Sequence, residues 1–145
     1  MEIDMKSFHL EILTPERAFY IGDCQSLIVP TSDGMLGIMA NHTPLTAAVF
    51  DGEVSFVKPD GERVLCAVSP GMLDVADNTV KLLCESVLLP EEIDEEKERR
   101  QAENALLQLR EKQGHRDYIL SQLAFANAVN NLRVKQHNAM RMNHL

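Results

Sequence analysis

The side chains best suited to metal binding or nucleophilic attack are five histidines and three cysteines. They are His9, His42, His115, His137 and His144, together with Cys24, Cys66 and Cys84. No two histidines stand four residues apart, as a helical metal site would need, and HExxH and GxSxG motifs are absent. The cysteines show no CxxC spacing, and each lies in an apolar segment typical of a buried free thiol. We expect no catalytic residue, bound metal or cofactor.

Two further patterns could support chemistry on phosphates or metals. The glycine-rich phosphate loops GxGxxG and GxxxxGKS/T do not occur. Acidic residues gather between positions 91 and 98, where they could bind a metal ion or act as a general base. The start of a helix explains this cluster better, because the helix dipole favours negative charge there.

The segment 33–45 fits no simple strand or helix pattern, since it combines two glycines, a proline and several apolar residues. It could be a long turn whose glycines supply special backbone angles. It could equally be a loop that presents apolar groups to a partner. The residue pattern leaves both interpretations open.

Residues 1 to about 89 carry the pattern of short strands and turns. Residues 8–12 alternate apolar and polar, the period of a half-buried strand, and the apolar run 27–29 is expected to stop at Pro30. Two pairs of apolar segments flank turn signals and predict hairpins. These pairs are 54–57 with 64–68 around Pro59-Asp60-Gly61, and 71–75 with 79–84 around Asp77-Asn78. Such a series predicts a β-sandwich or barrel.

The pattern changes to helical at Pro90, the last proline. The acids from Glu91 to Glu96 would begin a first helix, and Ala102, Ala105, Leu106 and Leu109 have the spacing of its apolar face. Gly114 is a candidate for the residue that ends it, and Asp117 for the N-cap of a second helix. Residues 90–145 therefore predict a two-helix hairpin, which would lean on the sandwich or on a partner.

Composition and charge limit the functional class. The chain has 145 residues, of which 45% are hydrophobic and 25% charged, with a net charge of -8. This is a folded globular composition, and the negative charge disfavours nucleic-acid binding. No secretory signal or membrane-spanning run is recognisable, so we expect membrane association only through a partner. The negative charge belongs to residues 1–90, whereas the chain after Asp117 is basic, with Arg133, Lys135 and Arg141.

Three segments carry motifs that are specific when taken together. They are Gly34-Met35-Leu36-Gly37-Ile38 followed by Asn41-His42-Thr43-Pro44-Leu45, then Val68-Ser69-Pro70-Gly71-Met72-Leu73-Asp74-Val75, and finally Leu132-Arg133-Val134. They are similar, in this order, to the GxLGI–GHxPL, SGGxLEV and LRV motifs of the epsilon subunit family of bacterial F-type ATP synthases. The resemblance covers residues 6–135 and includes the order of a β-domain and a helical hairpin.

The resemblance implies a mostly β plus α protein with two domains. Residues 1–89 would form a flattened β-sandwich of about ten strands that docks on the gamma subunit and the c-subunit ring. Residues 90–145 would form an antiparallel two-helix hairpin with a regulatory role. The chain would be a central-stalk rotor subunit that couples proton or sodium flow to ATP synthesis. It would be a peripheral membrane protein on the cytoplasmic face of the bacterial membrane.

The resemblance also assigns candidate contact residues. Contacts to the c ring and gamma fall on Met35, Leu36, Ile38, His42 and Pro44. The family commonly has an acid where Met35 stands and glycine where Asn41 stands. In an extended form the hairpin would reach the alpha/beta catalytic head and inhibit ATP hydrolysis. Contacts to the acidic surface there fall on Arg133, Lys135 and Arg141.

Some family members bind ATP through an I/L-D-x-x-R-A motif at the first helix. Here Asp94 is kept, but Lys97 replaces the arginine and Glu98 the alanine. Leu88, Asn127 and Asn131 replace the charged residues that complete the motif. A lysine lacks the bidentate guanidinium, and Glu98 would repel phosphate, so we expect no useful ATP affinity.

Three functions remain as hypotheses. The first is a rotor subunit with a regulatory hairpin, and the segment 34–45 favours it. The second is an unrelated, non-catalytic β-sandwich adaptor module with a helical arm. The third is an enzyme whose site is assembled from scattered residues.

Overall fold

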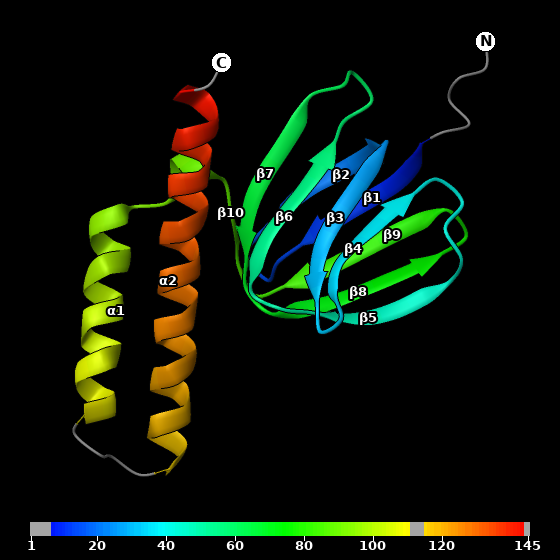
Figure 1. The fold of residues 1–145 in the computed structure, drawn as a ribbon. Coiled ribbons are helices and arrows are strands. Elements are labelled where there is room, and N and C mark those ends of the chain that lie inside the picture. Colours follow the sequence, from blue (N-terminus) through cyan, green and yellow to red (C-terminus); the bar gives the residue numbers. More distant parts are fainter. Residues whose placement is uncertain (1–6, 111–114, 144–145) are drawn as a thin grey trace. The chain divides into compact units, whose positions relative to one another are not determined.

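The computed structural model of the chain describes residues 7–110 and 115–143 (Figure 1). Within these residues, ten strands precede a short 3-10 helix and two α-helices. The chain divides into two compact units, one ending at Val87 and the other beginning at Leu88. We call them the sandwich and the hairpin. The predicted fold class, a β-sandwich of about ten strands followed by two helices, is confirmed.

The sandwich consists of two five-stranded sheets. Sheet 1 has the order β2-β1-β9-β8-β5, and sheet 2 has the order β10-β7-β6-β3-β4. The strands of sheet 1 are β1 (Phe8–Leu13), β2 (Ala18–Cys24), β5 (Leu45–Val49), β8 (Gly71–Ala76) and β9 (Thr79–Cys84). Those of sheet 2 are β3 (Ser26–Thr31), β4 (Gly34–Met39), β6 (Gly52–Val57), β7 (Arg63–Val68) and β10 (Val87–Leu88). Both predicted hairpins form, as the antiparallel pairs β6–β7 and β8–β9.

Alternate side chains of the strands fill the space between the two sheets. Leu10 and Ile12 of β1 are fully buried, as are Leu27 and Val29 of β3. Tyr20 of sheet 1 and Phe56 of sheet 2 meet across the core, with ring centroids 4.7 Å apart. This alternation is what a sheet with one buried face requires.

Two sequence expectations for the sandwich are wrong. Pro30 does not end its strand, because β3 continues to Thr31 and Pro30 pairs with Met35 of β4. The pairing of β3 with β6 covers Ser26, Leu27 and Ile28, so no second ladder needs the N–H that proline lacks. A single long turn over 33–45, one of the two interpretations left open, is also wrong. Residues 34–39 form strand β4, which follows a two-residue connection after β3, and residues 40–44 then connect it to β5.

The hairpin begins with the 3-10 helix η2 (Pro90–Glu92) and continues with α1 (Glu95–Arg110) and α2 (His115–Asn143). Figure 1 shows α1 and α2 side by side. The first helix begins later than expected because Asp94 caps it. One carboxylate oxygen, Oδ1, accepts the N–H groups of Glu96 and Lys97, each at 3.1 Å. Asp117 lies inside α2 and is not its N-cap, and Gly114 lies outside the described residues.

Within the described ranges, no helix combines the length and the apolar character needed to cross a lipid bilayer.

Candidate functional site

Strand β4 carries three of the five candidate rotor contacts and lies at the edge of sheet 2. Met35 and Met39 point outward, with 62% and 66% of their surface exposed. Ile38 lies in the core with no exposed surface, so its assignment as a side-chain contact is wrong. Leu36 is half-buried against the same core. Because side chains alternate along a strand, the outward residues of β4 are Met35, Gly37 and Met39.

The connection from β4 to β5 holds the other two candidates. Asn41 has a φ of 63°, a left-handed conformation that asparagine tolerates better than most residues and glycine adopts freely. This explains how asparagine can occupy position 41, where members of the family named above commonly have glycine. The Asn41 N–H donates to Oδ1 of Asn78 at 2.7 Å. His42 is partly exposed, with Nδ1 2.7 Å from the Thr43 carbonyl oxygen, and Pro44 is exposed.

Asn78 anchors this end of the sandwich. It occupies the β8–β9 turn with Asp77, and both residues have positive φ, as a two-residue hairpin turn requires. The Asn78 side chain donates from Nδ2 to the Ser7 carbonyl oxygen at 3.0 Å. The main-chain carbonyl of Asn78 accepts the His9 N–H at 3.1 Å. One side chain therefore joins the start of β1 to the β4–β5 connection.

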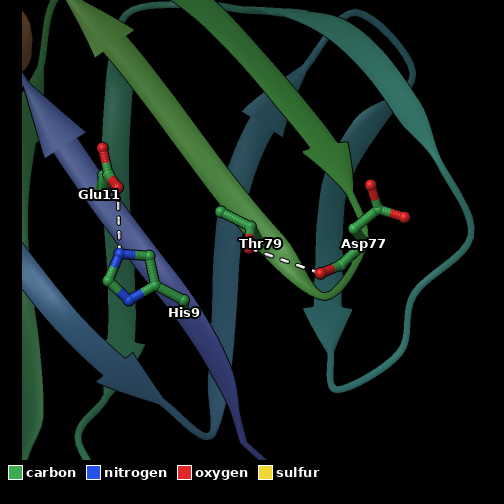
Figure 2. Close-up of polar contacts among 4 residues, drawn as sticks. All are labelled: His9, Glu11, Asp77 and Thr79. Carbon is green, nitrogen blue, oxygen red and sulfur yellow. Dashed lines mark hydrogen bonds and ion pairs between the residues drawn. The ribbon is translucent and has the colours of Figure 1, made fainter.

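The outer face of sheet 1 has a polar zone beside an apolar one. In the polar zone His9 Nε2 lies 3.0 Å from a carboxylate oxygen of Glu11, and the Thr79 hydroxyl donates to the Asp77 carbonyl at 3.5 Å (Figure 2). The Thr46 hydroxyl donates to Asp74 at 2.9 Å on the same face. The neighbouring cross-strand row is apolar and consists of Ala48, Met72, Leu83 and Leu13.

The residues missed by sequence reasoning are Met39, Met72 and Leu83, all of which expose half or more of their surface. The signal that could have found them is the period of two along a strand, which places every second residue of β4, β8 and β9 outside. In contrast, the three cysteines lie inside as expected. Burial raises the pKa of Cys66 above its ordinary value, raises the pKa of Cys84 to about 11, and also raises the pKa of Cys24.

Small and polar side chains make up the surface between α1 and α2, which we call the seam. An open hollow of about 300 Å³ lies there, lined by Gln101, Asn104, Ala105, Gln108, Ala124 and Asn127. The Ser121 hydroxyl donates to Oε1 of Gln108 at 2.8 Å. Among the described residues, Oε2 of Glu98 and Oδ1 of Asn127 are buried without a hydrogen-bond partner. A buried polar atom without a hydrogen bond is unfavourable, because it loses its hydration without a replacement.

Several large apolar residues of the hairpin are exposed, whereas Ile93 and Val134 are buried. Leu107, Leu120 and Leu123 each expose more than half of their surface, and Leu106 and Ile119 are also exposed. Leu106 was expected on the buried face of the first helix, so that expectation is wrong. Ala102 and Ala105, which belong to the same predicted apolar face of the first helix, are buried.

The three candidate contacts for a catalytic head have different surroundings. Arg133 is exposed on α2. Arg141 Nη2 lies 3.4 Å from Oδ1 of Asn138 on the same helix. Lys135 donates from Nζ to the carbonyl oxygens of Pro90 at 3.3 Å and Ile93 at 3.0 Å. Only part of this basic surface therefore faces solvent in the folded hairpin.

The residues at the degenerate nucleotide motif differ in their surroundings. Asp94 uses its carboxylate to cap α1, Lys97 is exposed, and Glu98 and Asn131 are buried. The open hollow beside them, of about 570 Å³, is lined by Ile93, Asp94, Glu95, Glu96, Arg99 and Lys135. Three of these six residues are acidic and two, Arg99 and Lys135, are basic, so the lining carries both signs of charge. Across the described residues, no three His, Cys, Asp or Glu side chains gather as a metal site.

Known proteins match this chain both over the sandwich alone and over nearly its whole length. Residues 7–90 match the family model "ATP synthase, Delta/Epsilon chain, beta-sandwich domain". The ATP synthase epsilon chain of Caldanaerobacter subterraneus subsp. tengcongensis is 36% identical over 129 residues, which are 89% of this chain and 94% of the relative. The epsilon chain of Caldicellulosiruptor bescii is 34% identical over 134 residues, or 92% and 97% of the two chains.

Two solved structures have the same fold. A chain of the Euglena gracilis mitochondrial ATP synthase superposes with a TM-score of 0.73 at 18% identity, over 97% of this chain and 84% of its own. A chain of the Tetrahymena thermophila mitochondrial ATP synthase central stalk and c ring gives 0.58 at 11% identity, over 88% and 95%. The family model spans more than half of the sequence and bacterial relatives exceed 30% identity over nearly all of it, so the chain belongs to the ATP synthase delta/epsilon family.

Proposed function

We propose that this chain is the epsilon subunit of a bacterial F-type ATP synthase, a non-catalytic part of the central stalk. The sandwich docks on the gamma subunit and the c ring, and the hairpin restrains ATP hydrolysis through the alpha/beta catalytic head. Membership of the delta/epsilon family is the observation that carries this proposal. The chain meets the membrane through this complex, on the cytoplasmic face.

The sandwich has surfaces suited to docking. Met35 and Met39 form an exposed apolar pair on an edge strand, and Pro44 extends the exposed surface along the following connection. Exposed apolar groups that gather on one surface are typical of interaction sites. Methionine side chains adapt to irregular partner surfaces because they are flexible and polarisable. We place the c-ring contact on Met35, Met39, His42 and Pro44.

The hairpin has the properties of a regulatory element. Its seam is small and polar, and several of its large apolar residues, such as Leu107, Leu120 and Leu123, are exposed. Few buried apolar contacts give the closed hairpin a small free energy advantage over an open one, which a switch between two arrangements requires. The exposed leucines are available to a partner in either arrangement.

Docking is tested by capture of a purified gamma–c-ring subcomplex with the full chain. We expect a stable complex at micromolar concentration, and we expect the double variant Met35→Arg, Met39→Arg to weaken it by about tenfold or more, because a charge would be buried at the contact. The matched control is Met140→Arg, since Met140 is a similarly exposed methionine of α2. Absence of any complex with the unaltered chain would contradict the docking role.

Inhibition is tested by ATP hydrolysis of the catalytic complex assembled with the full chain or with a chain that ends at Pro90. The shortened chain should stay bound and hydrolysis should rise. Equal rates in two preparations with the same subunit content would count against an inhibitory hairpin. Arg133→Gln in the full chain then measures how much of the effect depends on one exposed cation.

A further inference from the structure

We propose that Lys135 is a latch that closes the hairpin, because its ammonium group holds the segment before α1 against α2. Lys135 lies on α2, twenty residues after the start of that helix. Its Nζ donates to the carbonyl oxygen of Ile93 at 3.0 Å and to that of Pro90 at 3.3 Å. Both contacts lie within the same compact unit. A charged donor shared between two carbonyls is stronger than a neutral hydrogen bond.

The two carbonyls are available because of where α1 begins. The first carbonyl of the helical ladder is that of Asp94, which accepts the Glu98 N–H at 3.0 Å. Ile93 precedes this cap, so its carbonyl has no place in the ladder of α1. The Pro90 carbonyl accepts the Ile93 N–H at 3.2 Å and closes η2. Lys135 therefore joins the 3-10 turn and the residue before the cap to α2.

Lys135 lies at the opposite end of the seam from the Ser121–Gln108 hydrogen bond. Ser121 bonds to Gln108 of α1 near one end of the hairpin, and Lys135 follows Ser121 by fourteen residues, close to four helical turns on the same face. Between these two polar contacts lies Ala128, which is fully buried, together with the hollow lined by amide side chains. At this end of the hairpin Ile93 and Val134 are also buried, so the Lys135 bonds add to a small apolar contact there. The buried apolar residues of the seam are otherwise alanines, so we expect these bonds to have a measurable share in keeping that end closed.

The ammonium group of Lys135 can bind either these carbonyls or a partner, but not both at once. While it is bound to the carbonyls of Pro90 and Ile93, it cannot pair with an acidic surface of another protein. Engagement of Lys135 by the catalytic head, which rests on the proposed function, therefore requires the start of α1 to separate from α2. The exposed Arg133 has no such constraint and can pair in either state.

The latch is tested in the isolated full chain by amide hydrogen exchange, which does not depend on any partner. Lys135→Met removes the donors and the charge but keeps the apolar stem. We expect the amides of Ile93, Glu96 and Lys97 to exchange about tenfold faster. Lys135→Arg keeps a charged donor and should retain most of the protection. Arg133→Met is the matched control, and it should leave these amides unchanged.

Amides of β1 and β9 report whether each variant is still folded. Exchange at Ile93, Glu96 and Lys97 within twofold of the unaltered chain in Lys135→Met would overturn the latch. An equal effect of Arg133→Met would also overturn it, because the cause would then be helix charge and not a specific contact. Failure of the gamma capture or of the hydrolysis assay, with faster exchange in Lys135→Met, would reject the proposed function and leave the latch standing.

Discussion

The sandwich and the hairpin are stabilised by opposite kinds of side chain. The sandwich buries a continuous core of 18 residues, including Phe8, Leu10 and Phe56, and Ser69 is its one buried polar residue among those described. The hairpin buries mainly alanines and polar residues, with Ile93 and Val134 as its larger buried apolar side chains, and exposes several leucines. Buried apolar area is the main source of folding free energy, so the first unit is built to keep one structure. The second has less of this source of stability, which suits the exchange of contacts that we propose for it.

The largest expected effect comes from breaking the core of the sandwich. Phe56→Ala removes a ring that is almost fully buried and contacts Tyr20 across the two sheets. We expect a loss of about 3–5 kcal/mol in the free energy of unfolding, measured by urea denaturation. Phe50→Ala is the matched control, because half of the Phe50 surface is already exposed. Similar losses for the two variants would contradict the assignment of the core.

A substitution in the seam should act on the hairpin alone. Ala128→Leu introduces a larger side chain at a position with no exposed surface and should weaken the closed hairpin by about 1–3 kcal/mol. The measurement is the exchange rate of amides in α1, compared with amides of the sandwich strands. Ala126→Leu, on the exposed side of α2, should have no such effect. Slower exchange in Ala128→Leu would show that the seam tolerates bulk and is not finely packed.

The smallest expected effect is a difference between the sandwich and the hairpin in how their stability depends on pH. All three cysteines belong to the sandwich, and burial raises the pKa of Cys84 to about 11, as well as raising the pKa of Cys66. In the unfolded chain a thiol ionises near about pH 8.5. The unfolded state then loses protons first, so the stability of the sandwich is unchanged below that pH and falls as the pH rises towards about 11.

The unfolding free energy of the sandwich, measured over this range, should show that decline. Cys84→Ala should reduce its slope. The hairpin contains no cysteine, so protection of α1 amides, corrected for the chemical exchange rate, should show no corresponding decline. A flat profile for the sandwich would mean that its thiols are already ionised or solvated in the folded state.

Local patterns in the sequence predicted the elements that depend on neighbouring residues. The Pro59-Asp60-Gly61 and Asp77-Asn78 turns predicted both hairpins, and the structure confirms their pairing. The change in residue pattern at Pro90 predicted the start of the helical part. These features follow from backbone angles and short-range hydrogen bonds, which the residue types themselves determine.

Features that depend on distant residues were missed. Pro30 could remain in a strand only because β6 leaves β3 at that point, and no local pattern shows this. Ile38 was grouped with the exposed residues of its motif, although the alternation of β4 places it inside. The bond from Lys135 to Ile93 joins positions 42 residues apart, so no local pattern shows that this candidate partner contact donates hydrogen bonds within the hairpin.

The parallel ladder between β1 and β9 affects the order in which the chain can fold during synthesis. β1 leaves the ribosome first, but it lies between β2 and a strand that begins at Thr79. Sheet 1 therefore cannot be completed until most of the domain has been translated, whereas α1 and α2 meet through a short connection. Contacts between distant parts of a chain form slowly, and contacts between neighbours form fast. The sandwich, which has the larger apolar core, is thus the part of the protein whose sheet is completed late in synthesis, when β9 becomes available to pair with β1.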